Sequence, residues 1–175
     1  MKLDFVWAHY VVNLTNLITD FDIKKSCPDV MVMGDGLWNM LHFNNTSYYE
    51  FILQILKTKV VSLLPLSTKL AINKSVFSSV PIKSSLHLFW LGILHTEEER
   101  ENMSDAMWHV YDRALDDSKL LHQTCHPLLL LDSQSLTSNC GSHCTSDGMH
   151  YDEAIYEAVV QIMLNELLIE PDHRL

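Results

Sequence analysis

Three short apolar runs, separated by longer segments of helical character, constrain the fold of this chain most. The runs are Val30–Met33, Leu86–Ile93 and Leu128–Leu131, and each is apolar at nearly every position. Such runs are typical of strands covered on both faces, as in a parallel sheet. A further short strand is expected at Leu3–Trp7. The alternation of strands with helices predicts an α/β fold: a three-layer sandwich with a mostly parallel sheet, of the flavodoxin-like type.

Four helices are expected between and after these strands. They cover Thr15–Lys25, Ser47–Leu64, a segment from Thr96 to about Ser118, and a last helix that begins after Asp152. Thr96 and Glu99 form a capping box at the start of the third helix. Residues 66–85 are expected to form a loop. The apolar residues expected to face inward are Tyr48, Phe51, Ile52, Ile55 and Leu56 in the second helix, Met103, Met107, Val110, Tyr111 and Leu115 in the third, and Ile155, Tyr156, Val159, Val160, Met163 and Leu167 in the last.

The size and charge of the chain exclude several classes of protein. Its 175 residues suffice for one domain, expected to span 1–175, and its formal net charge is −10. This charge argues against nucleic acid or an anionic membrane surface as partner, since both require a basic patch. The longest apolar stretch, Leu88–Leu94, is far shorter than the roughly 20 residues that a membrane-spanning helix needs. No transmembrane segment is therefore expected.

The start of the chain and its asparagines bear on the compartment. Asp4 interrupts the apolar residues near Met1, so no signal peptide is expected here. Asn-x-Ser/Thr sequons nevertheless occur more often than the composition predicts, which favours a lumenal or extracellular history. The alternative is that these asparagines are ordinary polar loop residues. The five sequons begin at Asn13, Asn44, Asn45, Asn73 and Asn102.

The four cysteines leave their pairing open. Cys140 and Cys144 bracket a short polar segment that a disulfide can close, whereas Cys27 and Cys125 can pair or stay free. A structural zinc site is the alternative, with His143 and a nearby histidine such as His150 as further ligands. Zinc sites usually show a second pair of closely spaced ligands, so the disulfide is preferred and no metal is expected.

Chemistry is expected at the carboxyl ends of the strands, where sites form in parallel sheets. Three segments lie there: Gly34–Gly36, the turn after Ile93, and a polar loop from Asp132 to His150. Within that loop, Asp147 and His150 are three residues apart. At this spacing a carboxylate can hold one imidazole nitrogen and leave the other to act as a base. The alternative is a helix-capping aspartate near a surface histidine.

Two segments resemble blocks of the SGNH/GDSL-type hydrolase superfamily. The segment Ser146–Tyr151, leading into a closing amphipathic helix, resembles the last block of that superfamily. The segment Pro28–Trp38 resembles its third block, a strand that ends in Gly with an oxyanion-hole residue two positions later. Leu3–Trp7 resembles the strand before that block. Within the superfamily, the likeness is to the lumenal esterase-like domains of eukaryotic polysaccharide and sialic-acid O-acetyltransferases and to related plant proteins.

The resemblance implies the carboxyl-terminal portion of an acyl esterase or O-acetyltransferase domain that acts on carbohydrate esters. It makes Asp147 and His150 the acid and base of a Ser-His-Asp triad, which needs no cofactor. Gly34 and Gly36 would contribute to the oxyanion hole, although Gly36 stands where the block usually has Asn. Trp38 could line the pocket, and Asp35 could orient a substrate hydroxyl or simply form the turn.

The nucleophile block itself, Gly-Asp-Ser, has no counterpart before Leu3. Loss of the nucleophile from a serine triad costs on the order of a million-fold in turnover, so this chain alone is expected to be inactive. Its full-length relative is expected in the secretory pathway, in the Golgi lumen or outside the cell. A non-catalytic carbohydrate- or protein-binding module of the same fold is the second hypothesis, and a zinc-binding structural domain is the third. Trp90 and Trp108 are expected in the core.

Overall fold

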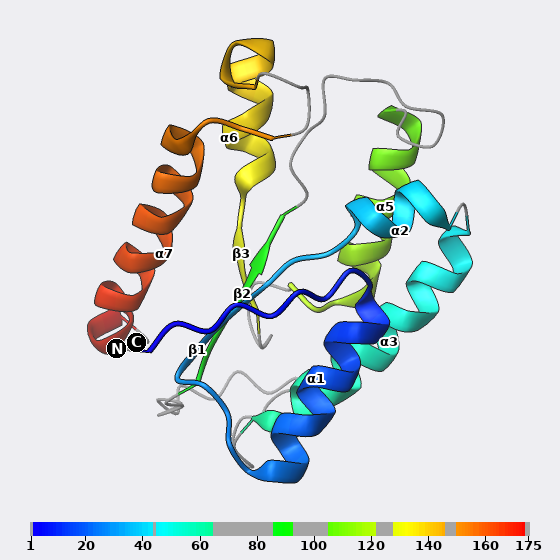
Figure 1. Cartoon of the computed structure of the whole chain (residues 1–175), viewed down its shortest axis with the longest axis vertical. Helices are drawn as coiled ribbons and strands as arrows, with labels where there is room; N and C mark the ends of the chain where they lie inside the picture. Colours follow the sequence, from blue (N-terminus) through cyan, green and yellow to red (C-terminus); the bar gives the residue numbers. More distant parts are fainter. Residues whose placement is uncertain are drawn as a thin grey trace.

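A three-stranded parallel sheet forms the middle layer in the computed structural model of the chain (Figure 1). The structure describes residues 2–43, 45–64, 86–92, 105–121, 128–145 and 150–173. The strands are β1 (Val30–Met33), β2 (His87–Leu91) and β3 (Leu129–Leu131), in the order β1-β2-β3. Met33 of β1 pairs with Trp90 of β2, and Leu91 of β2 pairs with Leu131 of β3.

Three helices cover one face of the sheet and enclose the larger core. They are α1 (Val11–Lys24), α3 (Thr46–Leu63) and α5 (Asp105–Ser118), and α3 packs against both of the others. Alternate residues of β1 and β2 point to this side, as expected from the pleat of a strand. The buried residues of this core include Val11, Leu14, Ile18, Met31, Met33, Ile52, Leu53, Leu56, Val60, Leu88, Trp90, Trp108, Tyr111 and Leu115.

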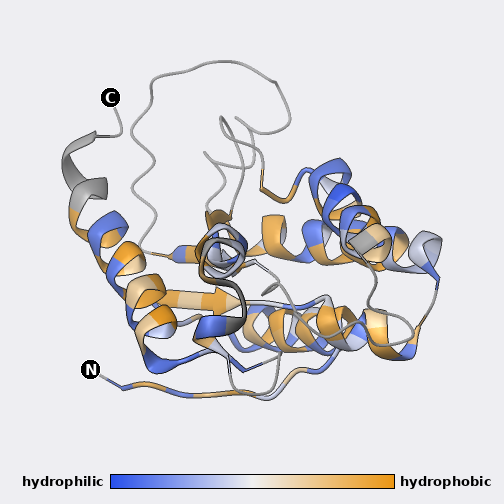
Figure 2. Ribbon diagram, turned by 90° about the horizontal axis from the view of Figure 1, so that it is seen from above, coloured by the Kyte–Doolittle hydropathy of each residue, from blue (hydrophilic) through white to orange (hydrophobic). Residues whose placement is uncertain are grey.

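The opposite face is covered by the last helix of the chain. After β3 come α6 (Ser133–Cys140), a 3-10 turn η1 (Gly141–Cys144) and α7 (Glu153–His173). A small second core joins Phe89 of β2, Leu131 of β3 and Val159 of α7. Figure 2 shows α7 on one side of a hydrophobic strand and the helices of the larger core on the other. The predicted α/β sandwich with a parallel sheet is therefore confirmed, as are β1, β2 and β3 and the four predicted helices over their described residues. The predicted start of the third helix at Thr96 lies outside the described residues.

The strand predicted at Leu3–Trp7 is wrong. This segment has no regular secondary structure, and Leu3 and Phe5 are 87% and 81% exposed. A strand requires a neighbouring backbone to bond with, and the described part of the sheet does not supply one there.

Two helices between the predicted elements were also missed. A short helix, α2 (Leu37–His42), follows β1, and the predicted polar loop from Asp132 to His150 contains α6 and η1. Asp132 lies directly before α6 and stabilises its start, because its carboxylate accepts hydrogen bonds from the backbone amide and the hydroxyl of Ser135. Serines and threonines that can cap a helix also suit a loop, so the polarity of this segment did not distinguish the two.

The predicted inward face of α3 is only half right. Ile52 and Leu56 are buried, but Phe51 is 60% exposed and the buried positions also include Leu53 and Val60. Because α3 is apolar on more than one side, the helices that pack against it decide which side is buried.

The coverage of β1 also differs from expectation. Met31 and Met33 are buried, whereas Val30 and Val32 are 37% and 46% exposed on the other face. Among the described residues, α7 packs mainly against β3, and Val32 of β1 lines an apolar cavity beneath α7, so this face of β1 is only partly covered.

Several predictions fall outside the described residues. They are the loop at 66–85, the capping box of Thr96 and Glu99, the pairing of Cys125, and Asp147. Over the residues that the structure does describe, none of the helices combines the length and hydropathy needed to cross a bilayer.

Candidate functional site

The turn after β1 depends on two glycines. A side chain at Gly34 would lie 3.2 Å from both Cβ and the carbonyl oxygen of Leu91, so the close approach of β1 to β2 favours glycine here. Gly36 has a φ of 131°, which residues with a Cβ rarely adopt. The turn leads directly into α2, with Gly36 at the N-cap position.

Asp35, between these glycines, carries a buried carboxyl group. The side-chain amide of Asn39 donates a hydrogen bond of 2.5 Å to Asp35 Oδ2. Asp35 Oδ1 is buried and accepts no hydrogen bond from the described residues. Burial raises the pKa of Asp35 to about 7, although the backbone amides of Gly36 and Val11 and the side chain of Asn39 act in the opposite direction. The carboxyl group thus ties the start of α1 to the start of α2.

Two buried tyrosines lie near Asp35. Tyr111 was predicted to face inward, whereas Tyr49 was not identified from the sequence. The rings of Tyr49 and Tyr111 lie 4.4 Å apart between their centroids, in the interface of α3 and α5. The hydroxyl of Tyr111 donates to the carbonyl oxygen of Phe43 at 2.8 Å. Burial, followed by the nearby charge of Asp35, raises the pKa of Tyr111 to about 12. Burial likewise raises the pKa of Tyr49, so both hydroxyls stay protonated. The Tyr111 hydroxyl links α5 to the residue after α2, whereas the Tyr49 hydroxyl is buried without a hydrogen-bond partner among the described residues. Helical spacing alone does not distinguish such tyrosines from apolar core residues.

Trp38, the second residue of α2, lies at the surface beside the turn. It is 37% exposed, and its ring stacks on that of His42 with centroids 5.5 Å apart. Trp7 from the amino-terminal segment meets Trp38 edge to face at 6.3 Å. Trp90 and Trp108, by contrast, are buried in the core as predicted.

His150 lies just before α7 and is exposed. Its neighbour Tyr151 forms an antiparallel bridge with Thr145, and the backbone amide of Asp152 donates to the carbonyl of Cys144 at 2.8 Å. These two contacts hold the entry to α7 against the end of η1. Figure 1 places the start of α7 and the turn after β1 at the same edge of the sheet. Asp147 is outside the described residues, so its predicted pairing with His150 stays a prediction.

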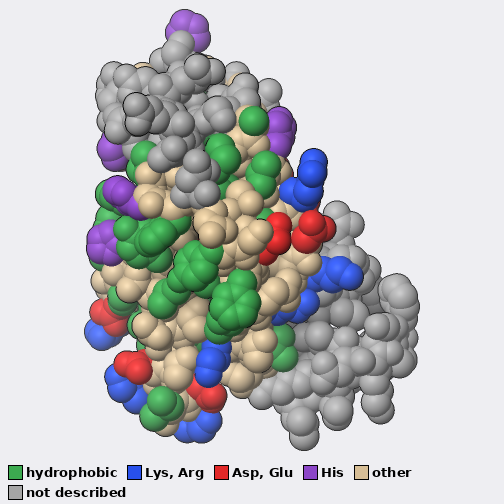
Figure 3. Space-filling view, turned by 90° about the vertical axis from the view of Figure 1, so that its right-hand side faces the viewer, with side chains coloured by type: hydrophobic (Ala, Val, Ile, Leu, Met, Phe, Trp, Pro, Cys, Tyr) green, Lys and Arg blue, Asp and Glu red, His purple; other side chains and the backbone are tan. Residues whose placement is uncertain are grey.

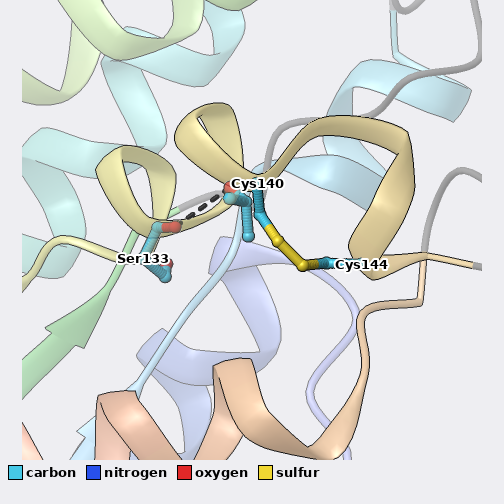
Figure 4. Close-up of a disulfide and its surroundings, with 4 residues drawn as sticks. Ser133, Cys140 and Cys144 are labelled. Atoms are coloured by element: carbon cyan, nitrogen blue, oxygen red, sulfur yellow. Dashed lines mark hydrogen bonds between the residues drawn. A yellow bond between two sulfur atoms is a disulfide. The ribbon is translucent and has the colours of Figure 1, made fainter.

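A disulfide joins Cys140 at the end of α6 to Cys144 at the end of η1 (Figure 4). The Cα atoms of the two residues are 5.8 Å apart, within the usual range for a disulfide. The zinc alternative would need both of these thiols. Within the described part of the chain, no group of three or more His, Cys, Asp or Glu residues is arranged to hold a metal ion.

Ser133, at the other end of α6, lies at the carboxyl end of β3 and could be mistaken for a nucleophile. Its side chain is fully buried, and its hydroxyl donates to the carbonyl of Gly92 at 2.7 Å. Its backbone carbonyl accepts a hydrogen bond of 3.0 Å from the hydroxyl of Thr137. Ser133 therefore anchors α6 to β2 and β3 and does not present a free hydroxyl.

The structure also has an apolar cavity of about 210 Å³ between the sheet and α7. Among the residues that line it, only Tyr156 carries a polar side-chain atom, so the cavity lacks the groups that acyl chemistry requires. The residues lining it are Val32, Leu91, Leu131, Tyr156, Val159, Val160 and Met163.

The fold and the site define an α/β domain whose polar and aromatic residues gather at the carboxyl edge of a parallel sheet. The chain is similar to the protein named Altered Xyloglucan 9 of Arabidopsis thaliana, with 51% identity over 177 residues. The match covers 97% of this chain and 47% of that relative, so the chain spans about half the relative's length. No protein-family model matches the chain, and no solved structure matches it.

Proposed function

We propose that this chain is part of a carbohydrate-acting acyl esterase or O-acetyltransferase of the SGNH type, and that residues 1–175 form one domain of it. The observation that supports the proposal is the position of His150, which is exposed and lies immediately before α7. The start of α7 and the turn after β1 lie towards the same end of the sheet (Figure 1). The substrate class is supported by the relative, whose name refers to xyloglucan. The disulfide and the sequons support a secretory-pathway location.

In the proposed mechanism, His150 accepts the proton of an attacking hydroxyl while Asp147 orients its imidazole. Backbone amides at Gly34–Gly36 stabilise the oxyanion that forms on the ester carbonyl. The hydroxyl is not supplied by a Gly-Asp-Ser block within these residues. The chain by itself therefore binds the ester without cleaving it.

A specific observation favours a second candidate, the non-catalytic binding module. The backbone amide of Gly36 interacts with the carboxyl group of Asp35, which draws this donor away from a substrate oxyanion. A module of this kind would keep the affinity for carbohydrate and have no preference for acylated forms.

Titration with acetylated and deacetylated xyloglucan oligosaccharides tests the proposal on the chain as it stands. We expect saturable binding that favours the acetylated form, with no release of acetate. His150→Ala should abolish the preference, whereas His143→Ala, which changes another exposed histidine, should retain it. Equal affinity for both forms would reject the acyl-ester function in favour of the binding module. Acetate release that depends on His150 would instead refute the claim that the chain alone is inactive.

A further inference from the structure

A continuous series of aromatic rings runs across the surface from the amino-terminal segment to α2. We refer to Phe5, Trp7, His9, Tyr10, Trp38 and His42 as the aromatic ridge. Neighbouring rings have centroids 5.2 to 6.4 Å apart, and most of them meet tilted or edge to face. The ring of Trp38 joins both halves of the ridge, because it contacts Trp7 and His9 on one side and His42 on the other.

The ridge is exposed although it is built from large apolar side chains. Phe5 is 81% exposed, Trp7 58% and Trp38 37%, and the side chains of His9 and His42 are exposed as well. Exposed aromatic clusters of this kind mark interaction sites more often than isolated surface residues do. Figure 3 shows that hydrophobic side chains gather in the middle of the face on the right-hand side of Figure 1, with histidine and charged side chains mostly around them.

The chemistry of the ridge fits an uncharged ligand that is apolar on its faces and polar at its edges. The ridge contains no Lys, Arg, Asp or Glu. The ionisable residues nearest to it in the sequence are Lys2 and Asp4, which pair with each other at 2.7 Å, and Asp35, whose carboxyl group is largely buried. Aromatic faces attract the C–H groups of a sugar ring, while indole and imidazole N–H groups can bond its hydroxyls. An anionic ligand is disfavoured, because the chain has a net charge of −10 and the ridge offers no fixed cation.

The ridge is continuous with the candidate site. Trp38 follows Gly36 by two residues, and the Asp35 carboxyl group fixes the start of the helix that carries it. A polymer bound along the ridge would therefore reach the turn after β1. We propose that the aromatic ridge binds the backbone of a neutral polysaccharide and directs it to this turn, an inference that rests on the proposed function.

Binding of an unacylated xyloglucan oligosaccharide, measured by isothermal titration calorimetry, tests the ridge. We expect Trp7→Ala and Trp38→Ala each to weaken binding by about tenfold, and Trp38→Phe to retain most of it. The matched control is Phe51→Ala, which removes a ring that is 60% exposed on α3 and lies outside the ridge. This control should leave the affinity unchanged.

The outcomes separate the ridge from the proposed function. If the wild type does not bind the unacylated oligosaccharide, or if Phe51→Ala weakens binding as much as Trp7→Ala does, the ridge proposal is wrong. It is also wrong if sedimentation shows that the ridge instead joins two copies of the chain, and that Trp7→Ala separates them without affecting sugar binding. A wild type that binds the unacylated oligosaccharide but shows no preference for the acetylated form would contradict the acyl-ester function and leave the ridge proposal in place.

Discussion

At the scale of single residues, the turn after β1 combines an unusual backbone conformation with a buried carboxyl oxygen. Gly36 adopts a backbone conformation suited to glycine, and Asp35 places a carboxyl group where water does not reach one of its oxygens. Burial of a charge is costly unless several donors compensate for it. For Asp35 the compensation is partial, which is why its pKa rises to about 7.

Asp35 should make the stability of the fold depend on pH. Its pKa is raised from 3.8 to about 7, so between these values the native state holds a proton that the unfolded chain has released. The free energy of unfolding should therefore fall as pH rises from about 4 to 7, and the whole of this decrease should be present above pH 7. Asp35→Asn should remove this slope and stabilise the protein at pH 7.5 by on the order of 2–4 kcal/mol, as measured by urea denaturation.

Asp29→Asn is the control, because Asp29 is exposed and lies immediately before the same strand. It should leave the slope between pH 4 and 7 unchanged. An identical slope in the wild type and in Asp35→Asn would show that the Asp35 carboxyl group is solvated in solution.

At the scale of elements, packing decides which face of an apolar helix is buried. The residues of α3 have apolar side chains on two sides, and the described residues cover the side that faces α1 and α5. Leu53 is fully buried there, whereas Phe51 is largely exposed.

Truncation of these two residues should separate the faces of α3. Leu53→Ala should lower the free energy of unfolding by about 2–5 kcal/mol, because it leaves a cavity in the core. Phe51→Ala should change it by less than about 0.5 kcal/mol, as is usual for an exposed position. Thermal and chemical denaturation would measure both, and an equal cost at the two positions would place Phe51 in a buried contact.

The disulfide between α6 and η1 is a second feature at this scale. It closes a loop with a sequence separation of 4, so the entropy it removes from the unfolded chain is small. The double variant Cys140→Ser, Cys144→Ser should lose roughly 2 kcal/mol of stability. Cys27→Ser, which changes an exposed cysteine that is not bonded to another described cysteine, should have no effect. If reduction by dithiothreitol leaves the free energy of unfolding of the wild type unchanged, the Cys140–Cys144 disulfide does not stabilise the fold and the prediction is wrong.

At the scale of the whole molecule, the two faces of the sheet are covered unequally. The side of α1, α3 and α5 holds the large core, while α7 leaves an apolar cavity and the exposed Val30 and Val32 of β1 on the other side. Within the described residues, β1 also bonds only to β2, so its outer edge is open and uncharged. Open apolar edges of this kind tend to pair with other chains.

The open side of β1 should make the isolated chain self-associate. We expect sedimentation velocity to show association that increases with concentration, and Val32→Lys to suppress it, because a charge on an edge strand opposes pairing. Ile23→Lys changes a residue that is 72% exposed near the end of α1 and should not suppress association. A wild type that stays monomeric at every concentration would contradict this prediction.

The sequence alone was sufficient for the elements whose signal is local. Apolar runs at Val30–Met33 and Leu128–Leu131 marked strands, and the long apolar periodicities marked helices, because burial of such segments is favourable in almost any arrangement. The glycines of the turn after β1 and the closely spaced Cys140 and Cys144 were also visible, since turn geometry and short-loop closure depend on near neighbours.

Only the tertiary structure decided the properties that depend on distant partners. Leu3–Trp7 has the composition of a strand, but no backbone in the described part of the chain pairs with it, and α3 buries whichever face its neighbours cover. The buried carboxyl group of Asp35 and the aromatic ridge arise because segments far apart in the chain meet at one edge of the sheet. Hydrophobic periodicity indicates which side chains favour burial, but contact with another element determines whether a given side chain is buried.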